Sequence, residues 1–557
     1  MLNKKKIYVT AFCIISIPFI VGCSNIKNNL EENISIPTVE LLNIIESKSF
    51  NKYNNNVMEY NLGNVYLGEG EETVKVDLKG TIGVPKSIKD APIIFVISGN
   101  NNSISQSNEE LEYDTYKGFN YLVDALSKAG FLTVAISTDI KIDESQQDYI
   151  VEDKILNLVF EEHYESLKDA ISGKNNKYPI SLNNKGDINN IGLIGQSNTG
   201  RTIYNIANQQ LSKGISNIKG LLSITPSSGI SISSYPDIPS SILSTEHSLD
   251  TNIGFDMYND IEKMANRESF SQLTYLIGGN SDKFNDLVKQ DTLNPSNNNE
   301  VSNVSRASVL TNEDTIQDES THEEFLASYA VDFFEYIFGV NIENGLYDTN
   351  SATVQKIYQK DILSKLYVKE KIELFNSTST SSVYFNNIKS KNVIESSISS
   401  IDTAIDFNEP STNIELNLLQ LDWKSKNASL DILVDKSKKN FSVYNSISIE
   451  WALNHASDLN INDLSKVSLV LKDSQNNKSK VILLDELPLN KIIGDSEIKI
   501  IDNKSISTWS RFTPIAETRI PLNLIKEVDL ENIDSLSIDF GDNESGSVYI
   551  KNISLKK

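Results

Sequence analysis

Ser197 lies in residues 195–200 (GQSNTG), the stretch of this sequence best suited to chemistry. A short apolar run, residues 191–194, precedes the stretch, and a run with helical spacing, residues 201–207, follows it. A serine in a tight turn between a strand and a helix is held in a strained conformation, with its hydroxyl exposed above the helix N-terminus. Such a serine suits nucleophilic attack on a carbonyl carbon. Thr199 stands where a second glycine is usual, so the motif alone also fits an ordinary turn that contains a serine.

A base near Ser197 is the second requirement, because a serine hydroxyl is a weak nucleophile until its proton is taken. The chain has only four histidines. Of these, His247 is the candidate base, and it has two acidic neighbours in the sequence, Glu246 and Asp250. The alternative, which the sequence favours, is that His247 is a polar loop residue without a catalytic role.

The other three histidines fit the site less well. His163 lies on a predicted helix, residues 151–171, and we expect it at the surface. His322 begins the last predicted helix of this region and is expected near the helix cap, with a role as base as the alternative. His455 lies much further along the chain and is not expected at the site.

The segments around Ser197 alternate between strands and helices from about residue 55 to residue 340. Continuous apolar runs are typical of buried parallel strands, and segments with apolar residues at helical spacing separate them. This alternation predicts an open, mostly parallel sheet covered by helices on both faces. The clearest strand signals are residues 92–97, 131–136, 191–194, 220–225 and 273–277, and the clearest helices are residues 119–126, 151–171 and 325–338.

The region from Tyr60 to Val340 resembles the α/β-hydrolase superfamily, nearest to exported bacterial esterases, acetylhydrolases and polyester hydrolases. The resemblance is carried by three segments in order: a strand ending at Ser98-Gly99, the GFNYL of residues 118–122, and the DINNIGLIGQS of residues 187–197. It implies an α/β-hydrolase fold with Ser197 as the nucleophile.

The same resemblance implies an oxyanion hole. The backbone N–H of Asn198 falls on one donor, and the second donor falls near Gly99 or Asn100. Acyl transfer places negative charge on a carbonyl oxygen, and fixed N–H groups stabilise that charge without reorganising.

Two positions depart from the family pattern. Ser281 occupies the place where the family has its histidine, and Gln196 stands where histidine is frequent. Asp282, beside Ser281, is expected to be a solvated turn residue rather than a replacement base. Two interpretations therefore remain. One is a serine hydrolase that acts on a small or polymeric ester with Ser197, with His247 or His322 as the base and with an acid such as Glu246 or Asp250, which lie in the loop where the resemblance implies the acid. The other is a catalytically degenerate domain kept for binding or surface structure.

The N-terminus predicts export. Residues 1–6 are basic, residues 7–21 are apolar, and Gly22-Cys23 ends the segment. This pattern resembles bacterial lipoprotein signals, which implies that Cys23 carries the lipid and that the protein is anchored to the extracytoplasmic face of the cell membrane. An uncleaved membrane anchor is the alternative. Residues 24–52 are polar and predict a linker from the bilayer.

Charge and composition exclude several function classes. The formal net charge is −24, which argues against nucleic acid as a partner. The sequence contains no glycine loop that would cradle a phosphate, no zinc-type ligand spacing and no nicotinamide or flavin fingerprint. We expect neither a metal nor a cofactor.

The C-terminal region has a different pattern. We assign residues 53–345 to the hydrolase-like domain and residues 346–380 to a connecting segment. Short alternating segments dominate residues 381–557, so this region is predicted to be an antiparallel β-sandwich. This region resembles galactose-binding-like jelly rolls, which implies a cell-surface glycan as a partner. The candidates for sugar stacking, with core packing as the alternative, are Trp423, Trp451 and Trp509; the candidates for calcium, with a solvated acidic turn as the favoured alternative, are Asp539, Asp542 and Glu544.

Overall fold

The structure is a computed structural model with mixed α/β content and large sheets. It describes residues 43–46, 51–68, 73–99, 114–139, 149–247, 251–287, 319–341, 344–378, 382–396, 415–454, 457–460, 464–482, 498–501, 504–507 and 515–557. Residues 35–557 belong to one compact unit. The signal segment, Cys23, Asp250, His455 and Trp509 lie outside the described residues.

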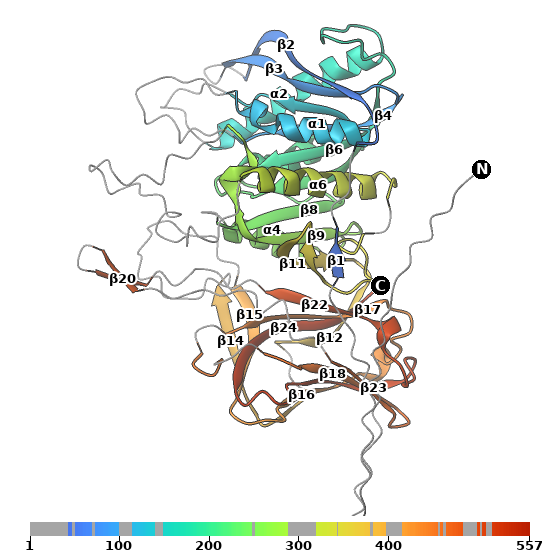
Figure 1. Cartoon of the computed structure of the whole chain (residues 1–557), viewed down its shortest axis with the longest axis vertical. Helices are drawn as coiled ribbons and strands as arrows, with labels where there is room; N and C mark the ends of the chain where they lie inside the picture. Colours follow the sequence, from blue (N-terminus) through green and yellow to red (C-terminus); the bar gives the residue numbers. More distant parts are fainter. Residues whose placement is uncertain are drawn as a thin grey trace, which may run out of the picture. The chain divides into compact units, whose positions relative to one another are not determined.

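The largest sheet described contains eleven strands in the order β1-β10-β11-β9-β8-β7-β6-β4-β5-β3-β2 (Figure 1). The six neighbouring strands from β9 to β5 in this order are parallel, whereas β2, β3 and β11 join antiparallel. The bounds are β1 Asn43–Ile45, β2 Asn55–Leu67, β3 Val74–Pro85, β4 Ala91–Ile97, β5 Leu132–Ile136, β6 Gly186–Gln196, β7 Ile218–Ile224, β8 Ser240–His247, β9 Ser271–Asn280, β10 Val354–Ile357 and β11 Lys360–Tyr367.

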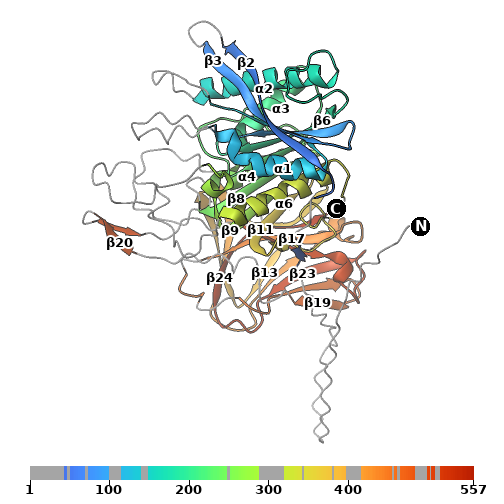
Figure 2. The same ribbon diagram turned by 45° about the horizontal axis from the view of Figure 1, so that its top comes forward.

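Helices cover both faces of this sheet. On β4, Ile93 and Phe95 belong to one apolar cluster and Ile94 and Val96 to the other, as the alternation of side chains along a strand requires. Buried residues of α2 (Tyr149–Ile171), α3 (Thr199–Ser212) and α4 (Thr251–Glu262) join the first cluster. Buried residues of α1 (Asn120–Ala129) and α6 (Glu319–Ile337) join the second, and these two helices lie side by side (Figure 2).

The C-terminal strands form antiparallel sheets. One follows the order β14-β15-β24-β17-β22 with β12 also paired to β24, and another follows β13-β16-β23-β18-β19. Inward residues of both sheets share one apolar core. The bounds are β12 Lys371–Asn376, β13 Val383–Asn386, β14 Ile388–Ser396, β15 Glu415–Trp423, β16 Ser429–Leu433, β17 Ser446–Leu453, β18 Ser468–Asp473, β19 Lys478–Ile482, β22 Ala516–Pro521, β23 Ile533–Asp539 and β24 Gly546–Lys556; β20 (Ile498–Ile501) and β21 (Lys504–Ser507) form a separate pair.

Two segments expected to be connections contribute strands. Within the predicted linker, β1 pairs in parallel with β10 at the end of the large sheet. The segment predicted to connect the domains, residues 346–380, supplies β10 and β11 to the large sheet and β12 to the C-terminal sheet. These residues complete sheets by backbone hydrogen bonding, which has little signature in side-chain composition.

The two tryptophans that the structure describes do not serve as sugar platforms. Trp423 and Trp451 are both buried, and Trp423 stacks on Phe540 with ring centroids 4.2 Å apart. Their ring N–H groups donate to the Asn543 carbonyl and the Thr518 hydroxyl respectively. The alternative of core packing is therefore the correct one for this pair.

Candidate functional site

Ser197 forms the turn between β6 and α3 and has a φ of 59°. This left-handed conformation is costly for a residue with a Cβ. Its backbone N–H donates to the Ile224 carbonyl at 3.0 Å, and its carbonyl accepts from the Ser227 N–H at 3.2 Å. The turn therefore anchors to β7 and the segment after it, which leaves the Ser197 side chain half-buried at the carboxyl ends of the parallel strands.

The hydroxyl of Ser197 donates to the hydroxyl of Ser227, with the two oxygens 3.3 Å apart. Ser227 lies between β7 and β8. No carboxylate or imidazole among the described side chains hydrogen-bonds to the Ser197 hydroxyl. Sequence reasoning missed Ser227, because no motif marks it; it reaches the turn only through the order of the strands.

Gly99 approaches the turn from the end of β4. A Cβ built on Gly99 would lie 2.9 Å from the Cβ of Ser197 and 2.8 Å from the Gln196 carbonyl oxygen, so a side chain does not fit. The Gly99 N–H donates to Gln196 Oε1 at 3.4 Å. The second donor expected for an oxyanion is thus near Ser197, held by a long hydrogen bond to a neighbouring amide.

Asn198, the other expected donor, precedes the first residue of α3. Its backbone N–H has no acceptor in the part of the chain that the structure describes. Its side chain is fixed at both ends: Oδ1 accepts from the Thr199 N–H at 2.9 Å, and Nδ2 donates to Glu152 Oε1 at 2.7 Å. The unpaired N–H at a helix N-terminus favours negative charge beside Ser197.

Glu152 of α2 is a buried carboxylate directly behind this turn. Burial raises the pKa of Glu152, although the hydrogen bond from Asn198 lowers it in part. No motif in the sequence connects Glu152 with this turn, since its partner Asn198 is 46 positions away and the contact depends on how α2 packs beside α3. Together, Glu152 and Thr199 hold Asn198 in one orientation.

Two histidines are buried in structural roles. His163 was expected at the surface, but it is fully buried and its Nδ1 lies 3.0 Å from the Tyr60 hydroxyl, so that prediction is wrong. Desolvation by burial lowers the pKa of His163 to about 3, which keeps the ring neutral. His322 is also fully buried, and its Nε2 accepts from the Asn280 N–H at 2.8 Å. In this arrangement the Nε2 lone pair of His322 is engaged and cannot receive a proton from Ser197.

His247 is the last residue of β8 and pairs with Asn280 of β9. Because β6, β7, β8 and β9 run in parallel, its backbone lies at the same edge of the sheet as Ser197. The His247 side chain lies outside the described part, as does Asp250. The contact between His247 and Ser197 therefore stays a prediction.

Glu246 and Ser281 occupy the neighbouring strand ends. Glu246 Oε2 accepts from the Gly278 N–H of β9 at 2.7 Å. Ser281, at the position expected for histidine, begins a short 3-10 helix, Ser281–Phe284, and its hydroxyl donates to Asp282 Oδ1 at 3.4 Å. Neither residue forms a hydrogen bond with Ser197.

No protein-family model matches the chain, and a search of curated proteins finds no significant match. Across the described ranges, no group of three histidine, cysteine or acidic side chains is placed to hold a metal ion. Among the described helices, none combines the length and apolar character that crossing a bilayer would need.

Proposed function

We propose that the chain is an α/β-hydrolase-fold lipoprotein of the extracytoplasmic membrane face, and that it cleaves an ester or similar acyl bond with Ser197. The observation that carries this proposal is the strained backbone at Ser197, with its φ of 59°. A strained residue at the carboxyl end of a parallel sheet, just before a helix, is the arrangement that a nucleophile requires. The parallel strands and the two helix layers support the fold assignment.

The reaction would proceed by acyl transfer. The Ser197 oxygen bonds to the ester carbonyl carbon while its proton passes to a base, for which His247 is the candidate. The N–H groups of Asn198 and Gly99 stabilise the oxyanion, once the substrate oxygen replaces Gln196 Oε1 at Gly99. The alcohol leaves with the proton from the base, and water then releases the acid and frees Ser197.

A fluorophosphonate probe tests the proposal, since it bonds to serine only when the hydroxyl is activated. We expect labelling of the full chain at Ser197, located by peptide mass spectrometry, and its loss in Ser197→Ala. Ser227→Ala is the matched control, because it keeps the nucleophile and removes only the partner of its hydroxyl. Absence of labelling in the wild-type chain, or labelling that persists in Ser197→Ala, would contradict the proposal.

A second function is favoured by one specific observation: the only hydrogen-bond partner of the Ser197 hydroxyl among the described side chains is another serine. A serine paired in this way is not activated. The alternative proposal is therefore a catalytically degenerate fold that acts in binding at the cell surface, and the same labelling experiment separates the two. A glycan partner for the C-terminal sheets remains a proposal on the resemblance alone, without Trp423 and Trp451 as stacking platforms.

A further inference from the structure

The chain beyond strand β4 contains the peptide that joins Ser98 to Gly99, and its orientation decides where the Gly99 N–H points. Strand β4 ends at Ile97, and both Ser98 and Gly99 are buried although they lie beyond the strand. Buried backbone groups need hydrogen-bond partners, and here the strand no longer supplies all of them. Side chains from two other elements supply partners for the carbonyls.

Two threonines hydrogen-bond to consecutive carbonyls at this strand end. Thr199 Oγ1, at the start of α3, lies 2.7 Å from the Ile97 carbonyl oxygen. Thr138 Oγ1, two residues beyond β5, donates to the Ser98 carbonyl at 2.9 Å. Strand β4 lies between β6 and β5, and successive carbonyls of an extended chain point to opposite sides. The Ile97 carbonyl therefore faces the side of β6 and α3, and the Ser98 carbonyl faces the side of β5.

The Ser98 carbonyl determines the direction of the Gly99 N–H because both groups belong to one peptide unit. The described residues contain no cis peptide bond, and in a trans unit the C=O and N–H groups point in opposite directions. With the Ser98 carbonyl held on the side of β5, the Gly99 N–H faces the side of β6, where it meets Gln196 Oε1 at 3.4 Å. Rotation of this peptide by half a turn would place a carbonyl oxygen where the proposed oxyanion needs a donor.

We propose that Thr138 is a positioning residue for acyl transfer at Ser197, because its hydroxyl holds the peptide between Ser98 and Gly99 with the Gly99 N–H directed towards the oxyanion. This inference rests on the proposed function. Thr138 acts through the Ser98 carbonyl. Its orientation matters because an oxyanion is stabilised by N–H groups that are already in place when the charge develops.

A network of buried hydroxyls surrounds the hydrogen bond from Thr138. Thr138 and Ser98 are both fully buried, and Ser98 Oγ lies 3.0 Å from Thr115 Oγ1 and 3.4 Å from Thr138 Oγ1. Thr115 Oγ1 in turn donates to Asp139 Oδ1 at 3.4 Å. A β-branched side chain has few χ1 rotamers, and burial among these partners restricts it further. The Thr138 hydroxyl is therefore kept in the orientation that reaches the Ser98 carbonyl.

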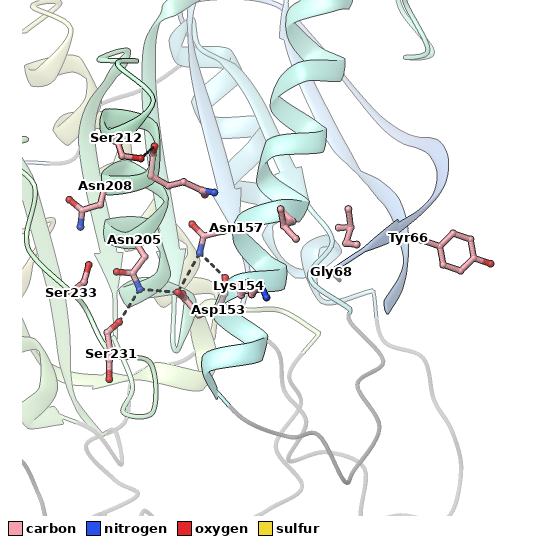
Figure 3. A pocket seen from close by; sticks show the side chains of 13 residues that line it. Tyr66, Gly68, Asp153, Lys154, Asn157, Asn205, Asn208, Ser212, Ser231 and Ser233 are labelled. Atoms are coloured by element: carbon pink, nitrogen blue, oxygen red, sulfur yellow. Dashed lines mark hydrogen bonds between the residues drawn. The ribbon is translucent and has the colours of Figure 1, made fainter. Parts of the chain in front are cut away.

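A second hydroxyl-to-carbonyl hydrogen bond shows by contrast what distinguishes Thr138. In a polar groove along α2 and α3, Ser212 donates to the Gln209 carbonyl at 2.7 Å (Figure 3). That hydrogen bond joins residues three positions apart in one helix, and the described residues that line the groove do not include Ser197 or Gly99. The hydrogen bond from Thr138 spans 40 positions and connects the ends of two neighbouring strands, so it fixes one strand end relative to the other.

The rate of fluorophosphonate labelling of Ser197 in the full chain tests the inference. Thr138→Val keeps the shape of the side chain and removes the hydroxyl. We expect the maximal labelling rate at saturating probe to fall at least about tenfold, and the probe concentration that gives half of this rate to stay within about twofold. Thr138→Ser keeps the hydroxyl and should label nearly as fast as the wild type. Thr133→Val is the matched control, because it removes a buried hydroxyl of β5 that donates to the Phe131 carbonyl at 3.3 Å, and it should label as the wild type does.

Thr138→Ala repeats the test with a smaller side chain, in case Thr138→Val does not fold, and the same slow labelling is expected. A wild-type rate in either folded variant would overturn the inference. Labelling of Thr138→Ser as slow as that of Thr138→Val would also overturn it, since the loss would then come from the methyl group and its packing. An equal loss in Thr133→Val would attribute the effect to a general loosening of β5. Absence of labelling in the wild-type chain would instead contradict the proposed function itself, and this inference with it.

Discussion

The turn at Ser197 and a buried ionic cluster near the C-terminal sheets differ in how completely their polar groups are paired. At the turn, the backbone is strained; among the described residues, the Asn198 N–H has no acceptor and the Ser197 hydroxyl has one long hydrogen bond. In the ionic cluster, every charged group has a partner of opposite charge. Its members are Glu262 of α4, Lys365 of β11, Lys371 of β12, Glu450 of β17, Glu517 and Arg519 of β22, and Lys551 and Lys556 of β24.

The geometry of the ionic cluster explains its role. Glu450 accepts from Lys365 at 3.1 Å and from Lys551 at 2.9 Å, and Lys551 also reaches Glu262 at 2.5 Å. The Lys365 ammonium lies 4.8 Å from the centre of the Tyr258 ring. These pairs connect strand β11 and helix α4 with strands of the C-terminal sheets. The ionic cluster is thus fully paired and holds parts of the fold together, whereas the polar groups at the Ser197 turn are incompletely paired among the described residues.

The largest effect on stability is expected from Glu450→Gln. The substitution keeps the shape of the side chain but leaves Lys365 buried without its counter-charge, which should cost about 3–5 kcal/mol. Equilibrium unfolding in urea measures the loss. Glu544→Gln is the matched control, because Glu544 belongs to an exposed pair with Lys426 at 3.7 Å and should change stability by less than about 0.5 kcal/mol. Equal losses of stability in the two variants would mean that the buried pair of Glu450 contributes no more than the exposed pair of Glu544.

Lowering the pH should reduce the stability that this cluster provides and should remove the destabilisation caused by a different buried carboxylate, that of Asp256. Burial would raise the pKa of Glu517, but Lys556 and Arg519 lower it to about 2. The contribution of Glu517 to stability is therefore complete above pH 4.5 and is lost as the pH falls towards 2.

Asp256 of α4 is buried with neither oxygen hydrogen-bonded, and burial and then Asp260 raise its pKa to about 7. Its folded-state pKa exceeds the unfolded value of 3.8, so Asp256 reduces stability progressively as the pH rises from about 4 to 7.

Asp256→Asn should therefore stabilise the protein at pH 8 by up to about 4 kcal/mol, since the pKa is raised by about three units and one pKa unit corresponds to about 1.4 kcal/mol. At pH 4 the two proteins should unfold at nearly the same urea concentration. Urea titrations at both pH values measure this difference. A gain of the same size at pH 4 would mean that the effect comes from packing and not from the charge.

Local signals in the sequence predicted much of the region around Ser197. The apolar runs at residues 92–97 and 191–194 lie within β4 and β6, and the predicted helix at residues 151–171 is α2 apart from its first two residues. The turn at Ser197 and the proximity of Gly99 were predicted, because small residues at the end of a strand leave few conformations.

The sequence could not predict contacts that form only when helices and loops pack together. Glu152 meets Asn198, and Ser227 meets Ser197, only after α2 and the segment following β7 are placed beside α3. The same limit explains His163, whose helix faces the sheet at that position and whose partner, Tyr60, is 103 residues away. The pairing of β1 with β10 likewise depends on a sheet edge that becomes available only when the rest of the sheet has formed.

Glu152 provides a sharper test of the turn. Glu152→Ala removes the acceptor for Asn198 Nδ2, so we expect the fluorophosphonate labelling rate of Ser197 to fall about tenfold, equivalent to about 1.4 kcal/mol. Glu152→Gln is the matched control, because its amide oxygen can still accept that hydrogen bond, and it should label within a factor of about three of the wild type. Loss of labelling in both variants would indicate a requirement for the charge, and wild-type labelling in Glu152→Ala would exclude a positioning role.

The smallest expected effect addresses the strain itself. Ser197→Gly removes the Cβ that opposes a φ of 59°, so it should raise the free energy of unfolding by roughly 1 kcal/mol, whereas Ser197→Ala keeps the Cβ and should leave stability nearly unchanged. Urea unfolding of the two variants compares them directly, and equal stabilities would mean that the turn stores no strain. Both variants lack the hydroxyl and should fail to label. A glycine that stabilises the fold while it abolishes labelling would mean that serine is kept at position 197 for its hydroxyl, against the preference of the backbone.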